Sequence, residues 1–166
     1  MMPAAKVFQN EIIEIGAVKV NGNLEIVDEF SEFVKPVINP KLSDYCKELT
    51  TISQADVDAA ELFPKVLSRF KEWIGEDYVL CSWGKYDKSQ FERDCVRHNL
   101  DTIWLRNHIS LKHQHGEKVG GGKFVGMKAA LKSAGLALQG THHRGIDDAR
   151  NIAQLFIKYF DIWDFS

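Results

Sequence analysis

The fold of this chain is decided by the stretch Thr141-His142-His143-Arg144-Gly145-Ile146-Asp147-Asp148-Ala149-Arg150-Asn151-Ile152. Apolar residues recur at near-helical spacing from Ile146 onward, which predicts an amphipathic helix. Asp147 and Asp148 fall in its first turn, where free N–H groups and the helix dipole favour carboxylates. Two interpretations stay open at this point. Either the acids only stabilise the start of the helix, or a histidine in the preceding turn is a general base beside a metal ligand.

The run HHRGIDDARNIA, residues 142–153, resembles the last motif of the DEDDh 3′→5′ exonucleases. This superfamily includes RNase T and the proofreading subunit of bacterial replicative polymerases. In its motif a histidine is followed five residues later by an aspartate, and His143 and Asp148 match that spacing. The run is most similar to the H-S-G-x-D-D of the branch that trims RNA 3′ ends, with Arg144 in place of the usual serine. The resemblance implies that His143 is the general base and that Asp148 is a metal ligand.

Length and composition restrict the class of protein. A chain of 166 residues with 45% hydrophobic residues suits a single α/β domain spanning residues 1–166. The net charge of −2 gives no global field that would attract nucleic acid, so a nuclease needs a local site. Three cysteines without metal-type spacing are expected to be reduced, buried thiols. No signal peptide or long apolar run is seen, which predicts a cytoplasmic protein without membrane contact.

Periodicity and turn residues predict the order of the elements. A hairpin is expected first, because β-branched residues on either side flank the turn pair Asn21-Gly22. Ser53 is a predicted N-cap with Asp56 three residues later, as in a capping box. The expected strands are 11–20, 24–34 and 78–83, and the expected helices are 62–74, 87–98, a surface helix within 104–119, and 125–133. His113 and His115 within the surface helix should point to different sides, which argues against a metal site there.

Asp87 lies where a buried strand gives way to a helix, at Gly84-Lys85-Tyr86-Asp87. Such a corner often carries a ligand-binding group in α/β sheets. The simpler alternative is that Asp87 is only the N-cap of the helix. The run G-K-Y-D resembles the G-x-W-D of the exonuclease family, and this resemblance implies that Asp87 is a second metal ligand.

The segment NPKLSDYCKELT, residues 39–50, resembles the family segment N-P-Q-L-S-D-F-C-x-x-L-T. In the family its aromatic residue and its second leucine pack on the terminal base, which implies substrate-binding roles for Tyr45 and Leu49. Tyr86 stands where the family has a tryptophan. The alternative is that all three residues belong to the hydrophobic core. Lys85, Lys88 and Arg144 could meet phosphates, although scattered surface cations are the ordinary case.

The resemblance covers residues 9–160 and implies an RNase H-like exonuclease fold, a mixed sheet flanked by helices. The family begins with one more strand, which carries D-x-E, and this chain has no acid before Glu11. The first strand is therefore expected to be missing or altered. Glu11 and Glu14 are expected to be solvated acids on a strand face, with a replacement role as metal ligands as the alternative. A gap in the sheet would have to be filled by residues 1–8 or by another chain, which predicts a homo-oligomer.

Cleavage of a phosphodiester in such sites uses two Mg²⁺ or Mn²⁺ ions held by converging carboxylates, and a base near neutral pH. The sequence therefore predicts a metal-dependent 3′→5′ exonuclease domain acting on single-stranded RNA or DNA ends, with an incomplete two-ion site. The alternative is a catalytically inactive nucleic-acid-binding module, either a truncated form or a pseudo-enzyme.

Overall fold

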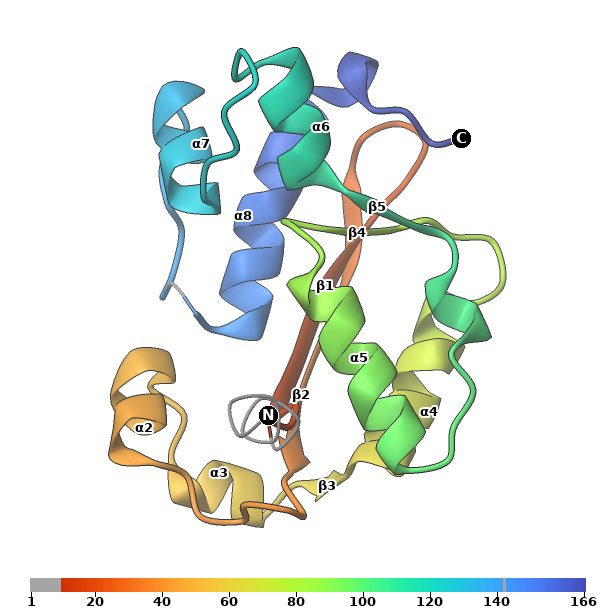
Figure 1. The fold of residues 1–166 in the computed structure, drawn as a ribbon, viewed down its shortest axis with the longest axis vertical. Coiled ribbons are helices and arrows are strands. Elements are labelled where there is room, and N and C mark those ends of the chain that lie inside the picture. The colour runs from red at the N-terminus through yellow and green to blue at the C-terminus, as the bar shows by residue number, and fades with distance from the viewer. Residues whose placement is uncertain (1–9, 142) are drawn as a thin grey trace, which may run out of the picture.

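A computed structural model describes residues 10–141 and 143–166 (Figure 1). The strands are β1 (Glu14–Val20), β2 (Ile26–Lys35), β3 (Glu61–Leu62), β4 (Leu80–Ser82) and β5 (His108–Ser110). The helices are α2 (Asp44–Thr50), α3 (Gln54–Asp58), α4 (Phe63–Ile74), α5 (Tyr86–Arg97), α6 (Leu111–Lys118), α7 (Met127–Ser133) and α8 (Gly145–Lys158), with single 3-10 turns at Ile103–Leu105 and Phe160–Ile162. The expectation that the first strand is missing concerns residues 1–9 and lies outside the described residues.

The strands form two separate sheets, which lie next to each other near the middle of the molecule (Figure 1). β1 and β2 are antiparallel, and β3 adds to β2 in parallel, so this sheet is mixed as expected. β4 and β5 form a separate parallel pair. Within the described residues no strand joins β1 to β4. Helix α8 covers one face of the β1–β2 hairpin and α4 covers the other (Figure 1), which is an α/β layer arrangement.

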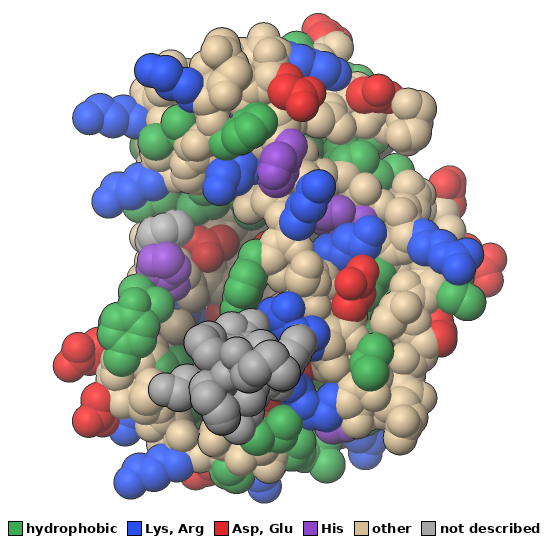
Figure 2. Space-filling model, viewed as in Figure 1, with side chains coloured by type: hydrophobic (Ala, Val, Ile, Leu, Met, Phe, Trp, Pro, Cys, Tyr) green, Lys and Arg blue, Asp and Glu red, His purple; other side chains and the backbone are tan. Residues whose placement is uncertain are grey.

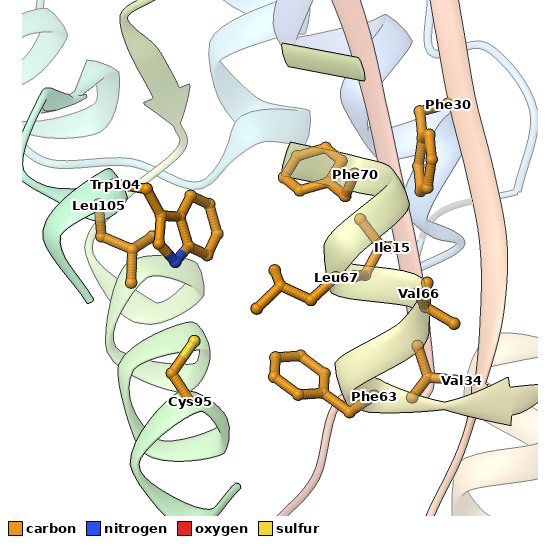
Figure 3. Close-up of a cluster of buried hydrophobic side chains, with 10 residues drawn as sticks. All are labelled: Ile15, Phe30, Val34, Phe63, Val66, Leu67, Phe70, Cys95, Trp104 and Leu105. Atoms are coloured by element: carbon orange, nitrogen blue, oxygen red, sulfur yellow. The ribbon is translucent and has the colours of Figure 1, made fainter. Parts of the chain in front are cut away.

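Alternation along β1 sends neighbouring residues to opposite faces of the hairpin. Ile15 is 3% exposed and points toward α4, into a cluster completed by helices α4 and α5. Figure 3 shows this cluster, whose members are Ile15, Phe30, Val34, Phe63, Val66, Leu67, Phe70, Cys95, Trp104 and Leu105. Each large apolar side chain buried there contributes roughly 1.5–3 kcal/mol to stability. The cluster fixes α4 and α5 against the hairpin.

Gly16 faces the opposite side, where α8 begins. A Cβ atom on Gly16 would lie 2.2 Å from the carbonyl carbon of Gly145, so the two backbones meet without a side chain between them. This approach needs glycine at position 16, since no real Cβ contact is that short. The start of α8 is thereby held directly on β1.

The prediction of one surface helix within residues 104–119 is wrong. The chain forms a 3-10 turn at Ile103–Leu105, then β5, then α6, and α6 packs partly into the core. His115 is 3% exposed, with its ring 5.3 Å from that of Trp83. The three residues of β5 are too few to show an alternating pattern, so only pairing with β4 reveals the strand. The His113 ring instead lies 5.3 Å from that of Phe124, tilted by 48°, so the two histidines point to different sides as predicted.

Several predictions from short sequence signals are confirmed, in particular where a side chain bonds to nearby backbone. The capping box at the start of α3 is confirmed, because Ser53 accepts from the Asp56 N–H at 3.1 Å and Asp56 accepts from the Ser53 N–H at 3.0 Å. The hairpin is also confirmed, but residues 21–25 connect its strands, not the pair Asn21-Gly22 alone. The three cysteines are free thiols as expected, although only Cys95 is fully buried.

No helix in the described part of the chain combines the length and the apolar character needed to cross a membrane.

Candidate active site

The candidate site lies at the start of α8, where the preceding turn holds His143 in a left-handed conformation with φ of 75°. The backbone N–H of His143 donates a hydrogen bond to Asp148 Oδ1 at 3.2 Å. The N–H of Asp148 in turn donates to the carbonyl of Arg144 at 2.9 Å, which closes the first turn of the helix. The histidine and the aspartate predicted to act together are therefore tied through the backbone of one short turn.

Asp87 lies close enough to Asp148 for the two carboxylates to repel each other. Burial is the first cause that raises the pKa of Asp87, and the charge of Asp148 is the second. Asp87 is nevertheless exposed to solvent. The alternative that Asp87 is the N-cap of α5 is wrong, since Lys85 is the N-cap and Asp87 stands in the first turn. Two like charges brought together at the surface favour a bound cation.

Asp147 has a different role from its neighbour Asp148. Its carboxylate accepts a hydrogen bond from the Thr141 N–H at 2.9 Å and pairs with Arg150 at 3.3 Å. The turn that it holds contains Gly140, with φ of 67°, where a Cβ atom would lie 2.3 Å from the Asp147 side chain. Asp147 thus shapes the loop that carries His143, whereas Asp148 bonds to the His143 backbone and its charge reaches Asp87.

The expectation that Glu14 is a solvated acid is wrong. Its side chain is 5% exposed and pairs with Arg144, whose Nη2 lies 2.9 Å from Glu14 Oε2. Glu14 also accepts a hydrogen bond from the Gly145 N–H at 2.5 Å. The carboxylate thus caps the free N–H groups at the start of α8, which the helix dipole favours. Hydrogen bonding to Glu14 raises the pKa of Arg144.

Glu11 is also engaged by the fold. Its carboxylate accepts hydrogen bonds from three consecutive backbone N–H groups at 2.8 to 3.0 Å, those of Val37, Ile38 and Asn39. These bonds fix the loop that leads into α2. Glu11 and Glu14 therefore hold the loop and the helix in place, and neither is a solvated acid on a strand face.

The three residues predicted to bind the terminal nucleotide are exposed. Tyr45 is 73% exposed, Leu49 is 39% exposed and Tyr86 is 63% exposed, so the alternative that they are core residues is wrong. Helix α2, which carries the first two, is tied to the start of α8 because Arg144 donates to the Thr51 hydroxyl at 3.4 Å. Figure 2 shows a hollow with acidic atoms inside it and a histidine at its edge. The role of Tyr45, Leu49 and Tyr86 in binding stays a prediction.

The carboxylates that converge could ligate a divalent cation through oxygen atoms, the donors that Mg²⁺ and Mn²⁺ prefer. The described residues bring Asp87 and Asp148 together for this. Across residues 10–141 and 143–166, no group of three or more His, Cys, Asp or Glu is placed to hold a metal. The pair therefore fits one part of a two-ion site.

Sequence reasoning missed the pairing of Glu14 with Arg144. Arg144 was recognised as a departure from the usual serine, and Glu14 stood at a strand position with an uncharged neighbour on each side. The sequence offers one signal for this pair. Glu14 is an acid between apolar residues, two positions before Gly16, and Arg144 is an unexpected arginine elsewhere in the chain. Only the fold brings positions 130 residues apart into contact.

Known proteins are similar to this chain over most of its length. The family model RNase_T, described as Exonuclease, matches residues 5–156. The chain is 33% identical to 3'-5' exoribonuclease 1 of Rattus norvegicus over 163 residues, covering 91% of this chain and 47% of that protein. It is 32% identical to ERI1 exoribonuclease 3 of Homo sapiens, covering 90% of this chain and 48% of that protein. The chain thus spans about half the length of the curated relatives it matches.

One solved structure is similar in both fold and sequence. It is the nuclease domain of 3'hExo, a DEDDh family member, bound to rAMP. The TM-score is 0.83 with 30% sequence identity, covering 91% of this chain and 81% of that chain.

Proposed function

This chain belongs to the RNase T-type exonuclease family of DEDDh 3′–5′ exonuclease hydrolases, and from this premise we propose that it removes nucleotides from single-stranded nucleic-acid 3′ ends. The family and the α/β exonuclease fold expected from the motifs are confirmed. The observation that carries the proposal is the meeting of Asp87 with Asp148, beside a turn that ties His143 to Asp148. RNA is the first substrate to test, because the relatives named above are exoribonucleases.

In the proposed reaction, His143 accepts a proton from the attacking water. Its imidazole stands on a turn whose backbone is bonded to Asp148, so proton acceptance takes place beside the carboxylate pair. Positioned general-base catalysis of this kind contributes roughly 10²- to 10⁴-fold to a rate.

Asp87 and Asp148 would hold the divalent cation, Mg²⁺ or Mn²⁺. When bound, such an ion supplies charge neutralisation at the phosphate and lowers the pKa of water. The two carboxylates would give up their mutual repulsion by sharing it. Further carboxylates beyond this pair belong to the two-ion arrangement of the family.

The terminal nucleotide would bind against Tyr45, Leu49 and Tyr86. Stacking of a base on an exposed ring is worth about 1–3 kcal/mol and does not depend on sequence. Exposed rings on α2 and at the start of α5 suit this role, since no core packing has to open for the base to enter. The alternative proposal is that the chain binds 3′ ends in this way without hydrolysing them.

The test is the trimming of a 5′-labelled single-stranded RNA in Mn²⁺ by the wild type, His143→Ala, Asp148→Asn and Asp147→Asn. We expect a ladder of shortened products from the wild type. His143→Ala and Asp148→Asn should slow it by about 100-fold or more. Asp147→Asn is the matched control, because its amide oxygen can still accept from the Thr141 N–H, and it should trim within a few-fold of wild type.

The outcomes separate the two functions. Equal trimming by His143→Ala and the wild type would contradict the role of His143. If the wild type binds the RNA but does not trim it, the binding-only function is correct. If it does neither, the site is misassigned.

A further inference from the structure

A band of lysines and aromatic rings lies beside the candidate site, where β4 and β5 end. The two strands are parallel, so their carboxyl ends meet at one edge, and α5 and α6 begin there. We call this surface the lysine–aromatic band, and its members are Lys85, Lys88, Lys112, His113, Lys123 and Phe124. Figure 2 shows basic, histidine and hydrophobic side chains gathered on this part of the visible face.

Contacts between neighbouring residues make the basic part of the band continuous. Lys112 at the start of α6 lies against Gly84, since a Cβ atom there would be 3.8 Å from its Cδ. The charges of Lys88 and Lys85 reach His108 on β5, where, after burial, they lower the pKa of that imidazole, which is about 4. His108 in turn lies 2.7 Å from the Ser82 hydroxyl at the end of β4. Three lysines from two helices thus surround the same strand ends.

None of these lysines is neutralised by the described part of the chain. No ion pair within residues 10–141 and 143–166 joins Lys85, Lys88, Lys112 or Lys123 to a carboxylate. Other lysines do find such partners, for example Lys65 with Glu61 at 3.3 Å. In a chain with a net charge of −2, this local excess of positive charge would attract an anion.

The aromatic part of the band is held open by the fold. Phe124 is 51% exposed, and its ring lies on Gly116, where a Cβ atom would be 2.1 Å from the ring. The ring centroid also lies 5.3 Å from that of His113, and His113 Nδ1 lies 2.5 Å from the Ser110 hydroxyl oxygen. The loop is anchored next to it, because the Trp83 indole N–H donates to the Val125 carbonyl at 2.9 Å. Glycine at position 116 thus seats a ring that is not buried.

We propose that the lysine–aromatic band binds the nucleotides upstream of the 3′ end, with lysines on successive phosphates and Phe124 stacked on a base. Lys85 and Lys88 flank Asp87 in sequence, so the band begins at the candidate active site. The inference rests on the proposed function, since it assigns the path of the same strand. An acidic peptide would match the lysines but would gain nothing from an exposed ring, whereas every base has a face that stacks.

The experiment measures binding of a 5′-labelled single-stranded oligoadenylate of about 12 nucleotides, a length within the usual site sizes, and of the diadenylate, by fluorescence anisotropy with Ca²⁺. The variant Lys85→Gln/Lys88→Gln/Lys112→Gln should bind the long RNA at least tenfold more weakly and leave diadenylate affinity within about twofold. The slope of log affinity against log salt should fall by about 2, since each single-strand phosphate contributes roughly 0.7.

The matched control has the same change of charge on other faces, with Lys35→Gln/Lys65→Gln/Lys158→Gln. It should bind the long RNA within about twofold of the wild type, because these lysines lie at the ends of β2 and α8 and on α4. Phe124→Leu keeps an apolar contact with Gly116 but removes the ring, and should weaken the long RNA about tenfold.

Two results would overturn the inference while leaving the proposed function intact. The first is a band variant that binds the long RNA as the wild type does. The second is polyglutamate that competes as well as the oligonucleotide, with no effect of Phe124→Leu, because the surface would then be a general anion site.

A third result would separate the two proposals in the other direction. If the long RNA binds through the band while the diadenylate neither binds nor is hydrolysed, the band is supported and the 3′-end site is wrong. If neither RNA binds, both are wrong.

Discussion

Two sets of carboxylates lie at the start of α8, and their surroundings are opposite. Glu14 and Asp147 face cations and backbone N–H groups, through Arg144, Arg150, Gly145 and Thr141. The charge of Asp148 reaches Asp87, and this repulsion, after burial, raises the pKa of Asp87. The first set stabilises the fold, whereas the second adds electrostatic energy that a cation would relieve.

One short stretch of sequence supplies an acid to each of the two sets. Asp147 and Asp148 are adjacent in sequence and equally favourable for the first turn of a helix. Their side chains make different contacts: Asp147 bonds to the Thr141 N–H and pairs with Arg150, whereas Asp148 accepts from the His143 N–H and its charge reaches Asp87 on α5. Glu14 and Asp147 thereby hold in place the backbone that carries His143 and Asp148.

The largest expected effect comes from breaking the contact that brings the first set together. Gly16→Ala places a methyl group 2.2 Å from the Gly145 backbone, so β1 and α8 must separate. We expect a loss of about 3 kcal/mol in the free energy of unfolding, measured by urea denaturation. Gly22→Ala is the control, because a Cβ atom there meets nothing within 4 Å, and it should change stability by less than about 0.5 kcal/mol. Equal effects of the two substitutions would disprove the close approach.

The next effect separates the charge of Glu14 from its hydrogen bond. Glu14→Ala leaves Arg144 and the Gly145 N–H without their acceptor and should cost about 2 kcal/mol, less than a fully buried pair because Arg144 is 26% exposed. Glu14→Gln keeps an oxygen for Gly145 and should cost about half as much, as measured by thermal and urea unfolding. A glutamine variant as unstable as the alanine variant would show that the charge alone matters.

The smallest effect has the opposite sign and concerns the second set, Asp87 and Asp148. A raised pKa means that folded Asp87 holds its proton more tightly than the unfolded chain does, so its contribution to stability is lost as the pH rises through the folded pKa. Asp148→Asn removes one cause of that rise, and its amide oxygen can still accept from the His143 N–H. Without divalent cations it should stabilise the protein by about 0.5 kcal/mol at pH 8, since Asp87 is open to solvent.

At pH 3 Asp87 is largely protonated, because its pKa is raised above the ordinary value of an aspartate, so this gain should shrink toward zero. Urea unfolding at the two pH values measures it. A loss of stability at pH 8 would place Asp148 in the first set, with the structural acids.

The amino-acid sequence predicted the elements whose signals are local. The helix after Gly145, the hairpin and the capping box at Ser53 follow from periodicity, turn residues and side chains that bond a few residues away. The motifs of the chain also predicted the family. Each motif consists of residues close together in sequence, His143 with Asp148 in one and the run ending in Asp87 in the other. Such signals survive because tertiary contacts do not change which residues are near in sequence.

The sequence did not predict the elements that exist only through distant partners. β5 has three residues and becomes a strand by pairing with β4, and α6 becomes partly buried because His115 packs on Trp83 and Tyr159. Glu14 and Glu11 looked solvated because a strand pattern shows which face an acid occupies but not what covers that face.

Local signals in the sequence therefore predict helix α8, the turn before it and the family to which the chain belongs. The tertiary structure decided which acids are neutralised and which face each other, because Coulomb and hydrogen-bond energies depend on distances of a few ångströms between elements far apart in the chain. It also decided that Phe124, Tyr45 and Tyr86 stand exposed, since burial depends on the neighbours that the fold supplies.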